Sequence, residues 1–127
     1  MAVTAQDMID AVNRYFDCVD GNDVPGTLKV MTPDCTLEIV TAGVKHRGQA
    51  AIQAMFERRL TTLVSGWHGE RVHATDPAKG FCACRFRAKS EETNGAKRDR
   101  TNINFFEFDG KLIRRIQVWM VGDNTLK

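Results

Sequence analysis

The sequence predicts an α+β fold, in which helices from the first half of the chain cover a sheet formed by the second half. Residues 5–20 and 48–63 carry apolar side chains three or four positions apart, which is the spacing of one helix face. From residue 67 onward, apolar and polar side chains alternate in successive runs, which is typical of half-buried strands. A sheet with one apolar face needs a cover, and amphipathic helices provide it.

The boundaries of the elements follow from turn and capping residues. Asp23 can cap a short second helix over residues 24–31, where Pro25 is tolerated in the first turn. The turn-forming stretch 32–34, Thr-Pro-Asp, then ends that helix. The expected helices are 5–20, 24–31 and 48–63, the expected strands are 35–40, 67–74, 81–89 and the two arms of a hairpin over 101–121, and residues 41–47 are expected to form a loop.

The C-terminal hairpin supplies the first polar residue of interest. Asp109-Gly110 between two alternating runs is a strong hairpin signal, because both residues adopt positive φ at little cost. On the first arm Asn104 shares a face with Phe106 and Phe108, and the second arm adds further apolar residues. An amide among phenylalanines is unfavourable unless another group hydrogen-bonds to it, so Asn104 is a candidate site residue.

Length and composition indicate one domain spanning residues 1–127. The net charge of +2, from 18 basic and 16 acidic residues, is too balanced to predict binding to nucleic acid or to an anionic membrane. No apolar run approaches the roughly 20 residues of a membrane span, and no secretory signal begins the sequence, so we expect a cytoplasmic protein.

The four cysteines form no Cys-x-x-Cys pair, and we expect them to be free thiols in a reducing compartment. A disulfide framework or a zinc site is the alternative. No phosphate-binding loop or metal-ligand triad is recognisable in the sequence, so we expect neither a cofactor nor a metal.

Several segments together resemble one known family. They are Met8–Phe16 with its Arg-Tyr pair, 21–23, 32–38, 46–52 and 103–110. With these segments the chain resembles the bacterial Δ5-3-ketosteroid isomerases and the SnoaL-like polyketide cyclases of the nuclear transport factor two-like superfamily. The resemblance implies a cystatin-like α+β barrel, that is, a cone-shaped, curved, mixed or antiparallel sheet wrapped around N-terminal helices. A concave mouth of this kind is where small ligands usually bind.

The resemblance also implies positions for catalytic groups. A steroid isomerase uses a carboxylate base together with a tyrosine and a protonated aspartic acid, which donate hydrogen bonds to the dienolate oxygen. These positions correspond to Ile39 for the base, Tyr15 for the tyrosine and Asn104 for the acid. Tyr15 and Asn104 can still polarise a carbonyl group. Ile39 cannot accept a proton, and loss of a positioned base removes roughly 100- to 10,000-fold of rate.

Another residue must therefore replace the base if the protein is an enzyme. His68 is the main candidate, because alternation places it with Val72 and Ala74 on the face expected to point inward, and histidine ordinarily titrates near pH 6.5. His73 has the opposite parity and is expected on the outer face. His46, in the loop before the third helix, is a weaker candidate near the mouth.

The remaining assignments concern the lining of the pocket and the surface. The residues expected to bind a hydrophobic substrate are Ile39, Phe56, Phe86, Phe106, Val118 and Met120. Glu38 alternates with Ile39 and is expected to point outward. The basic residues expected to form a solvated face are Lys97, Arg98 and Arg100, with Arg85 and Arg87 beside them.

Three functions are compatible with the sequence. The first is an isomerase or lyase that acts on a small hydrophobic ring ketone, steroid- or polyketide-like, with Tyr15, Asn104 and His68 as catalytic residues. The second is a non-catalytic protein that binds a similar ligand. The third is an interaction module, in which the outer sheet face with Trp119 forms a homodimer.

Overall fold

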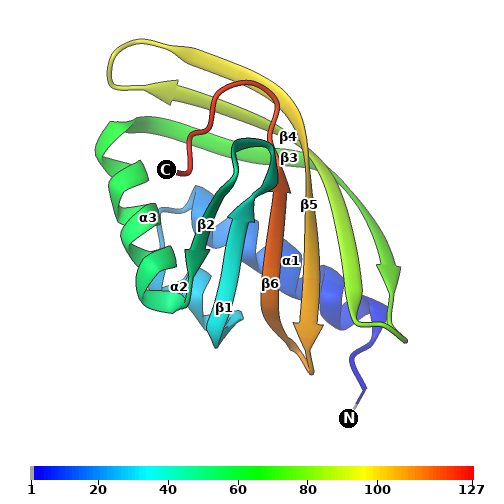
Figure 1. Cartoon of the computed structure of the whole chain (residues 1–127). Coiled ribbons are helices and arrows are strands. Elements are labelled where there is room, and N and C mark those ends of the chain that lie inside the picture. Colours follow the sequence, from blue (N-terminus) through cyan, green and yellow to red (C-terminus); the bar gives the residue numbers. More distant parts are fainter. Residues whose placement is uncertain (1) are drawn as a thin grey trace.

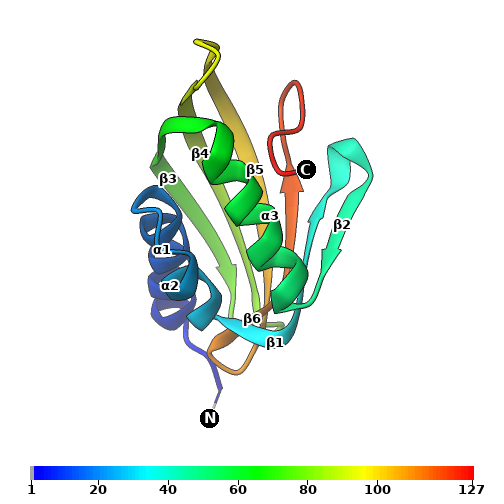
Figure 2. The ribbon, with the colours of Figure 1, turned by 90° about the vertical axis from the view of Figure 1, so that its left-hand side faces the viewer.

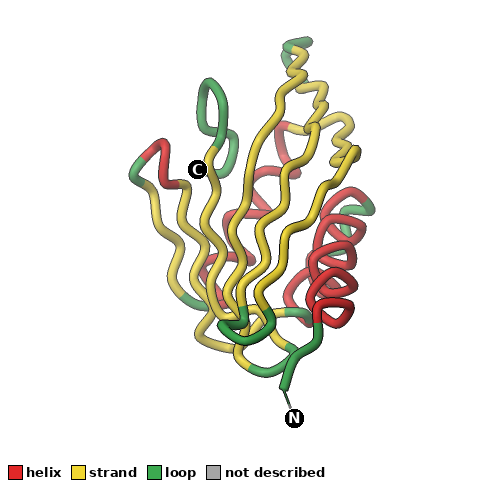
Figure 3. Tube along the Cα trace, turned by 90° about the vertical axis from the view of Figure 1, so that its right-hand side faces the viewer, coloured by secondary structure: helices red, strands yellow, loops and turns green. Residues whose placement is uncertain are grey.

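The computed structural model describes residues 2–127 and confirms the α+β fold. Three helices lie on one face of a curved, unclosed, six-stranded sheet (Figure 1). Seen from opposite sides, helix α3 (Gln49–Thr62) lies in front of the sheet in Figure 2 and behind it in Figure 3, and α1 (Ala5–Asp20) lies at the side of the sheet in both views. The elements are α1 (Ala5–Asp20), α2 (Val24–Lys29), β1 (Met31–Ile39), the 3-10 helix η1 (Val40–Ala42), β2 (Val44–Arg47), α3 (Gln49–Thr62), β3 (Leu63–Asp76), β4 (Phe81–Glu92), β5 (Lys97–Asp109) and β6 (Leu112–Trp119).

Helix α1 forms as its sequence predicts. Thr4 and Asp7 make a capping box, in which the Asp7 amide donates to Thr4 Oγ1 at 3.0 Å and the Thr4 amide donates to Asp7 Oδ2 at 3.1 Å. The buried stripe of α1 consists of Met8, Val12, Tyr15 and Phe16. These side chains pack against the sheet, and the stripe therefore fixes the face that α1 presents to it.

The sheet has the strand order β2-β1-β6-β5-β4-β3. Strands β3 to β6 form the predicted antiparallel meander, and β1 then pairs with β6 in parallel. The predicted hairpin is confirmed, but its loop lies one residue later than expected. Asp109 pairs with Leu112, so the loop is Gly110-Lys111, with Gly110 at a φ of 58° that suits glycine.

Several predicted boundaries are wrong. The second helix ends at Lys29, and β1 begins at Met31 rather than at residue 35. The predicted loop 41–47 contains η1 and the edge strand β2, which pairs with β1 over Thr36–Ile39. This strand was missed because it is four residues long and its pattern of burial depends on contacts distant in sequence.

Strand β3 contains a bulge that the alternation pattern does not show. Gly69 pairs with Arg87 and Val72 pairs with Arg85, so Glu70 and Arg71 both lie opposite Phe86. Glu70 adopts a φ of 52°, which is uncommon for a residue other than glycine.

The bulge reverses the direction of side chains along β3. His68 points inward as predicted, but Val72 and Ala74 are exposed instead of sharing its face. The prediction that His73 lies on the outer face is wrong. His73 pairs with the buried Cys84, and its Nε2 is itself buried. Burial, with a contribution from the charge of Arg71, lowers the pKa of His73.

The cysteines belong to the packed interior. Cys35, Cys82 and Cys84 are buried, and burial raises their pKa values to about 12, 11 and 11. None of the four cysteines, including Cys18, forms a disulfide. Because a buried thiol with a raised pKa is a poor nucleophile, these three are packing residues. None of the helices within residues 2–127 is long and apolar enough to cross a membrane.

The strained backbone at Glu70 gives a first testable prediction. Glu70→Gly should stabilise the fold by up to about 1 kcal/mol, because glycine adopts positive φ without steric cost. The matched control is Glu57→Gly in the exposed middle of α3, which should destabilise by about 1 kcal/mol. Urea unfolding measures both changes. A Glu70→Gly variant that is as destabilised as the control would contradict the strain.

Candidate functional site

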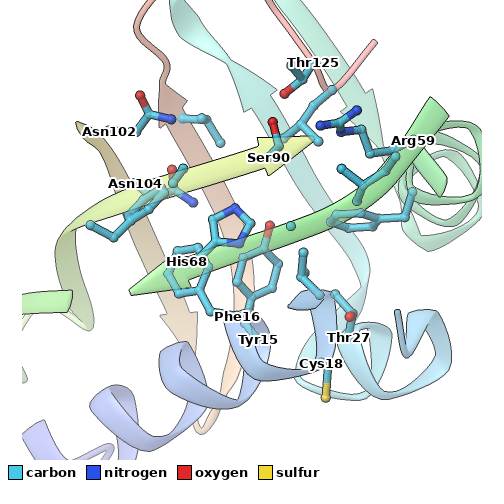
Figure 4. Close-up of a pocket in the computed structure, with 18 of the residues that line it drawn as sticks. Tyr15, Phe16, Cys18, Thr27, Arg59, His68, Ser90, Asn102, Asn104 and Thr125 are labelled. Carbon is cyan, nitrogen blue, oxygen red and sulfur yellow. The ribbon is translucent and has the colours of Figure 1, made fainter. Parts of the chain in front are cut away.

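A cavity lies between the inner face of the sheet and the helices (Figure 4). It encloses about 920 Å³, including the open space at its mouth. Its walls come from α1, α2, α3, β3, β4, β5, the end of β6 and the C-terminal segment, residues 120–127. The sequence therefore brings together residues from both ends of the chain around one space.

A two-point polar contact beside the cavity joins α1 to β3. Asp20, the last residue of α1, accepts a hydrogen bond from the backbone amide of His68 at 2.9 Å through Oδ2. Its Oδ1 lies 2.5 Å from Nδ1 of the same histidine. One carboxylate therefore holds both the backbone and the ring of His68. Asp20 was not predicted, because nothing in the sequence links a helix end to a strand 48 residues later.

The Asp20 contact determines the tautomer of His68. A carboxylate accepts hydrogen bonds, so in the neutral imidazole the proton lies on Nδ1 and the lone pair is on Nε2. The ring is held from its sides by Phe16, stacked at 5.2 Å, and by Phe86, tilted at 5.5 Å. Nε2 makes no hydrogen bond within residues 2–127, and the His68 side chain, which is 26% exposed, lines the cavity. The arrangement presents a proton acceptor to the cavity.

Tyr15 lines the same cavity from α1. Its ring is fixed by edge contacts with Phe16 at 5.1 Å and with Phe106 at 5.6 Å. Burial, with smaller effects from Cys35 and Asp20, raises the pKa of Tyr15 far above its ordinary value. The phenol therefore keeps its proton and can donate a hydrogen bond.

Asn104 lines the cavity from β5, opposite Cys84 on β4. Its Oδ1 is buried and has no hydrogen-bond partner among the described residues. Its amide also donates to no group of residues 2–127, which leaves the NH2 available to a ligand. Figure 4 shows Tyr15, His68 and Asn104 projecting into one cavity, so the structure brings the three predicted catalytic residues together.

The residues predicted to bind substrate divide into two groups. Phe56, Phe86, Val118 and Met120 line the cavity. Ile39 and Phe106 are completely buried and lie outside its lining. Ile39 is therefore a packing residue, and an acid at its position would be buried in the apolar core.

Two further candidates lie elsewhere. His46 is buried in β2, where its Nε2 lies 3.0 Å from the backbone carbonyl oxygen of Leu126 and so anchors the C-terminal segment. Glu38 is on the outer face as predicted and accepts a hydrogen bond from Gln117 Nε2 at 3.3 Å.

The prediction of a solvated basic face is wrong for two of its members. Arg98 and Arg100 share the inward parity of Asn104 and line the cavity, whereas Lys97 is exposed. The same alternation that places Asn104 inward, applied four and six residues earlier, would have found them. Both arginines bind Asp123, which follows β6 in the C-terminal segment.

The sequence model of the SnoaL-like domain matches residues 12–116. The chain belongs to the SnoaL-like domain family. This result confirms the predicted place within the nuclear transport factor two-like superfamily. No curated protein matches the sequence significantly.

Solved structures support the same fold for this SnoaL-like chain. A protein of Xanthomonas campestris named as a polyketide cyclase superposes with a TM-score of 0.82 at 14% identity, covering 91% of this chain and 90% of that one. A protein of Pseudomonas putida with the same designation gives 0.79 at 18% identity, covering 87% and 88%. TerC, co-crystallised with polyporic acid, gives 0.78 at 14% identity, covering 88% and 89%. At these identities the likeness shows a shared fold.

The anchoring of the C-terminal segment to the SnoaL-like domain should depend on pH. The hydrogen bond from Arg98 and the charge of Arg100 lower the pKa of Asp123 from 3.8 to about 2. A carboxyl whose pKa is lowered by folding stabilises the folded state above its ordinary pKa, and this contribution is lost as the pH falls through the folded value. We therefore expect the segment to loosen between about pH 4 and pH 2.

Carbon NMR of the Asp123 carboxyl group measures its titration directly. Hydrogen exchange at the Val121 amide, which donates to Asn102 Oδ1 at 2.9 Å, reports loosening of the segment. Arg100→Gln should move the titration of Asp123 to higher pH. Titration of Asp123 near its ordinary value in the unmodified protein would contradict the ion pairs.

Proposed function

We propose that this protein binds a hydrophobic ring ketone in its cavity and moves a proton at the carbon next to the carbonyl group. The contact between Asp20 and His68 carries the proposal, because it turns a free Nε2 lone pair toward the cavity. The apolar lining suits rings, and the phenol of Tyr15 and the amide of Asn104 suit a carbonyl oxygen. In this proposal His68 replaces the carboxylate base that Ile39 cannot provide.

The proposed first step forms an enolate. Nε2 of His68 takes a proton from the carbon beside the carbonyl, and the electrons of the broken C–H bond form a carbon–carbon double bond. Negative charge moves to the carbonyl oxygen, which accepts hydrogen bonds from Tyr15 and Asn104. Asp20 stabilises the imidazolium that results, as the carboxylate of a serine-protease triad does.

The second step decides the class of reaction. If His68 returns its proton to a different carbon, the ketone is isomerised. If the enolate carbon attacks a second carbonyl of the same molecule, a ring closes, and the imidazolium protonates the new alkoxide. The fold shared with proteins named as polyketide cyclases favours ring closure, and the binding of polyporic acid by TerC supports a cyclic ligand.

We also propose that the outer sheet face forms a homodimer. Val72, Arg85, Ile103 and Trp119 lie side by side across four strands. Val72, Ile103 and Trp119 expose 52%, 45% and 39% of their surface, so three apolar side chains, with Arg85 between the first two, are exposed on one face. A self-complementary apolar face is what a two-fold interface requires.

Deuterium exchange tests the proton transfer without knowledge of the natural substrate. The protein should accelerate exchange at the carbons next to the carbonyl of 2-tetralone in D2O, measured by proton NMR. His68→Gln should reduce the acceleration by roughly 100- to 10,000-fold, because it removes the base. Asp20→Asn should also reduce it, since an amide can donate to Nδ1 and so select the wrong tautomer.

The control for this experiment is His73→Gln, which changes a histidine outside the cavity lining and should leave exchange unchanged. Binding of 2-tetralone without accelerated exchange would favour the non-catalytic alternative. Equal exchange with the unmodified protein and with His68→Gln would exclude His68 as the base.

Sedimentation velocity tests the dimer. The unmodified protein should sediment as a dimer, and Trp119→Lys should yield a monomer, because the substitution puts an unpaired charge into the proposed apolar interface. Val64→Lys is the matched control, since Val64 is 59% exposed at the start of β3 and lies outside the proposed interface. A monomer at all concentrations of the unmodified protein would contradict the proposal.

A further inference from the structure

Three arginines surround one end of the cavity. Arg98 and Arg100 point inward from β5, and Arg59 comes from the last turn of α3. Their side chains are mostly buried, with 23%, 11% and 12% of their surface exposed. All three belong to the cavity lining. They lie at the end of the cavity near the start of β5, which is the end away from Asn104.

The carboxylates that pair with these arginines lie behind them. Arg59 makes a two-point contact with Glu92. Arg98 and Arg100 both bind Asp123. Neither Glu92 nor Asp123 belongs to the lining formed by residues 2–127. The cavity therefore meets the guanidinium groups rather than the acids.

The charges of this cluster are not balanced. Three guanidinium groups face two carboxylates, Glu92 and Asp123. Arg98 is shared between both acids. Its Nη1 lies 3.3 Å from Glu92 Oε2 in an orientation that makes no hydrogen bond. This nitrogen has no hydrogen-bond partner among the described residues. An excess cation in a mostly buried site is unfavourable unless an anion joins it.

The lining offers no compensating acid near this cluster. Within the described chain, Asp23 is the acidic residue of the lining, and its carboxylate is occupied at the start of α2, where it accepts from the Gly26 amide at 2.9 Å. Neutral hydrogen-bonding groups from Ser90, Asn102 and Thr125 line the cavity instead, and Figure 4 shows Ser90 and Thr125 close to Arg59. This end of the cavity is therefore positive and rich in hydrogen-bonding groups.

We infer that the ligand carries an ionised carboxylate, which binds at the arginine cluster while its ring ketone faces His68 and Asn104. The inference rests on the proposed function and adds the chemical class of the ligand. Arg100 and Asn104 lie four residues apart on one strand, roughly 14 Å between Cα atoms. The arginine side chain spans part of this distance, so the ligand is an extended ring acid whose carboxylate lies remote from the reacting carbonyl.

The alternative is that the arginines only anchor the C-terminal segment through Asp123. That role requires a cation for each acid, and Arg59 with Arg100 would meet it for Glu92 and Asp123. Arg98 is the additional charge. Arg98→Gln therefore leaves each carboxylate with one arginine, which makes it the most informative variant.

Displacement of a neutral fluorophore tests the inference. N-phenyl-1-naphthylamine fills apolar cavities and fluoresces when bound, and it is competed with 2-naphthoate or with 2-naphthamide. These two competitors share one ring system and differ in charge. We expect 2-naphthoate to bind roughly tenfold more tightly than the amide, with a preference that weakens as salt is raised.

Variants identify the group responsible. Arg98→Gln should abolish the preference for 2-naphthoate, and Arg98→Lys, which keeps the charge, should retain most of it. Arg14→Gln removes one positive charge from the exposed side of α1 and should change neither affinity. If Arg98→Gln does not fold, the salt dependence of the two competitors on the unmodified protein gives the answer.

The outcomes separate this inference from the proposed function. Equal affinity for the acid and the amide, or a preference that survives Arg98→Gln in a folded protein, would overturn carboxylate recognition. Failure of both competitors to displace the fluorophore would also overturn it. Exchange at 2-tetralone, which has no acid group, tests the proton transfer independently of this result.

Discussion

The site depends on one carboxylate at the end of a helix. Asp20 binds the backbone amide and the ring of His68, so a single side chain fixes where α1 meets β3 and which nitrogen of the imidazole is free. Phe16, one helical turn earlier, lies against the face of the same ring. Because Tyr15 is the neighbour of Phe16 on α1, the helix that orients the acceptor also supplies a donor. The geometry of the two groups is therefore coupled through a rigid element.

The inner face of the sheet changes character along β5. Phe106 belongs to the closed, apolar interior, Asn104 and Asn102 follow as amides, and Arg100 and Arg98 are charged. Each step is two residues, so strand alternation alone converts a linear order of side chains into a gradient of polarity across the cavity. A ligand with one apolar ring end and one charged end would have a preferred orientation in such a cavity. Orientation of this kind places a reacting carbon near a catalytic group before chemistry begins.

Most of the fold could be predicted from local sequence patterns. The parts of the site that depend on contacts between distant residues could not. Helical stripes, the capping residues and the C-terminal hairpin could be predicted because neighbours in sequence determine them. Asn104 was found from strand alternation and Tyr15 through a family resemblance, and both line the cavity. Asp20 could not be found, since its partner is 48 residues away, and strand β2 depends on pairing with β1. His73 was assigned to the wrong face because period-two alternation fails at a bulge.

The bulge at Glu70 reverses the alternation of inward and outward side chains within a single strand. Before it, β3 turns an imidazole toward the ligand space, and beyond it the same strand turns His73 toward the buried Cys84. One residue in an unusual backbone conformation thus lets two stretches of opposite parity serve one concave surface. Deletion of Glu70 would reverse the direction of the side chains in β3 either before or after this position. The neighbouring strands could keep their pairing.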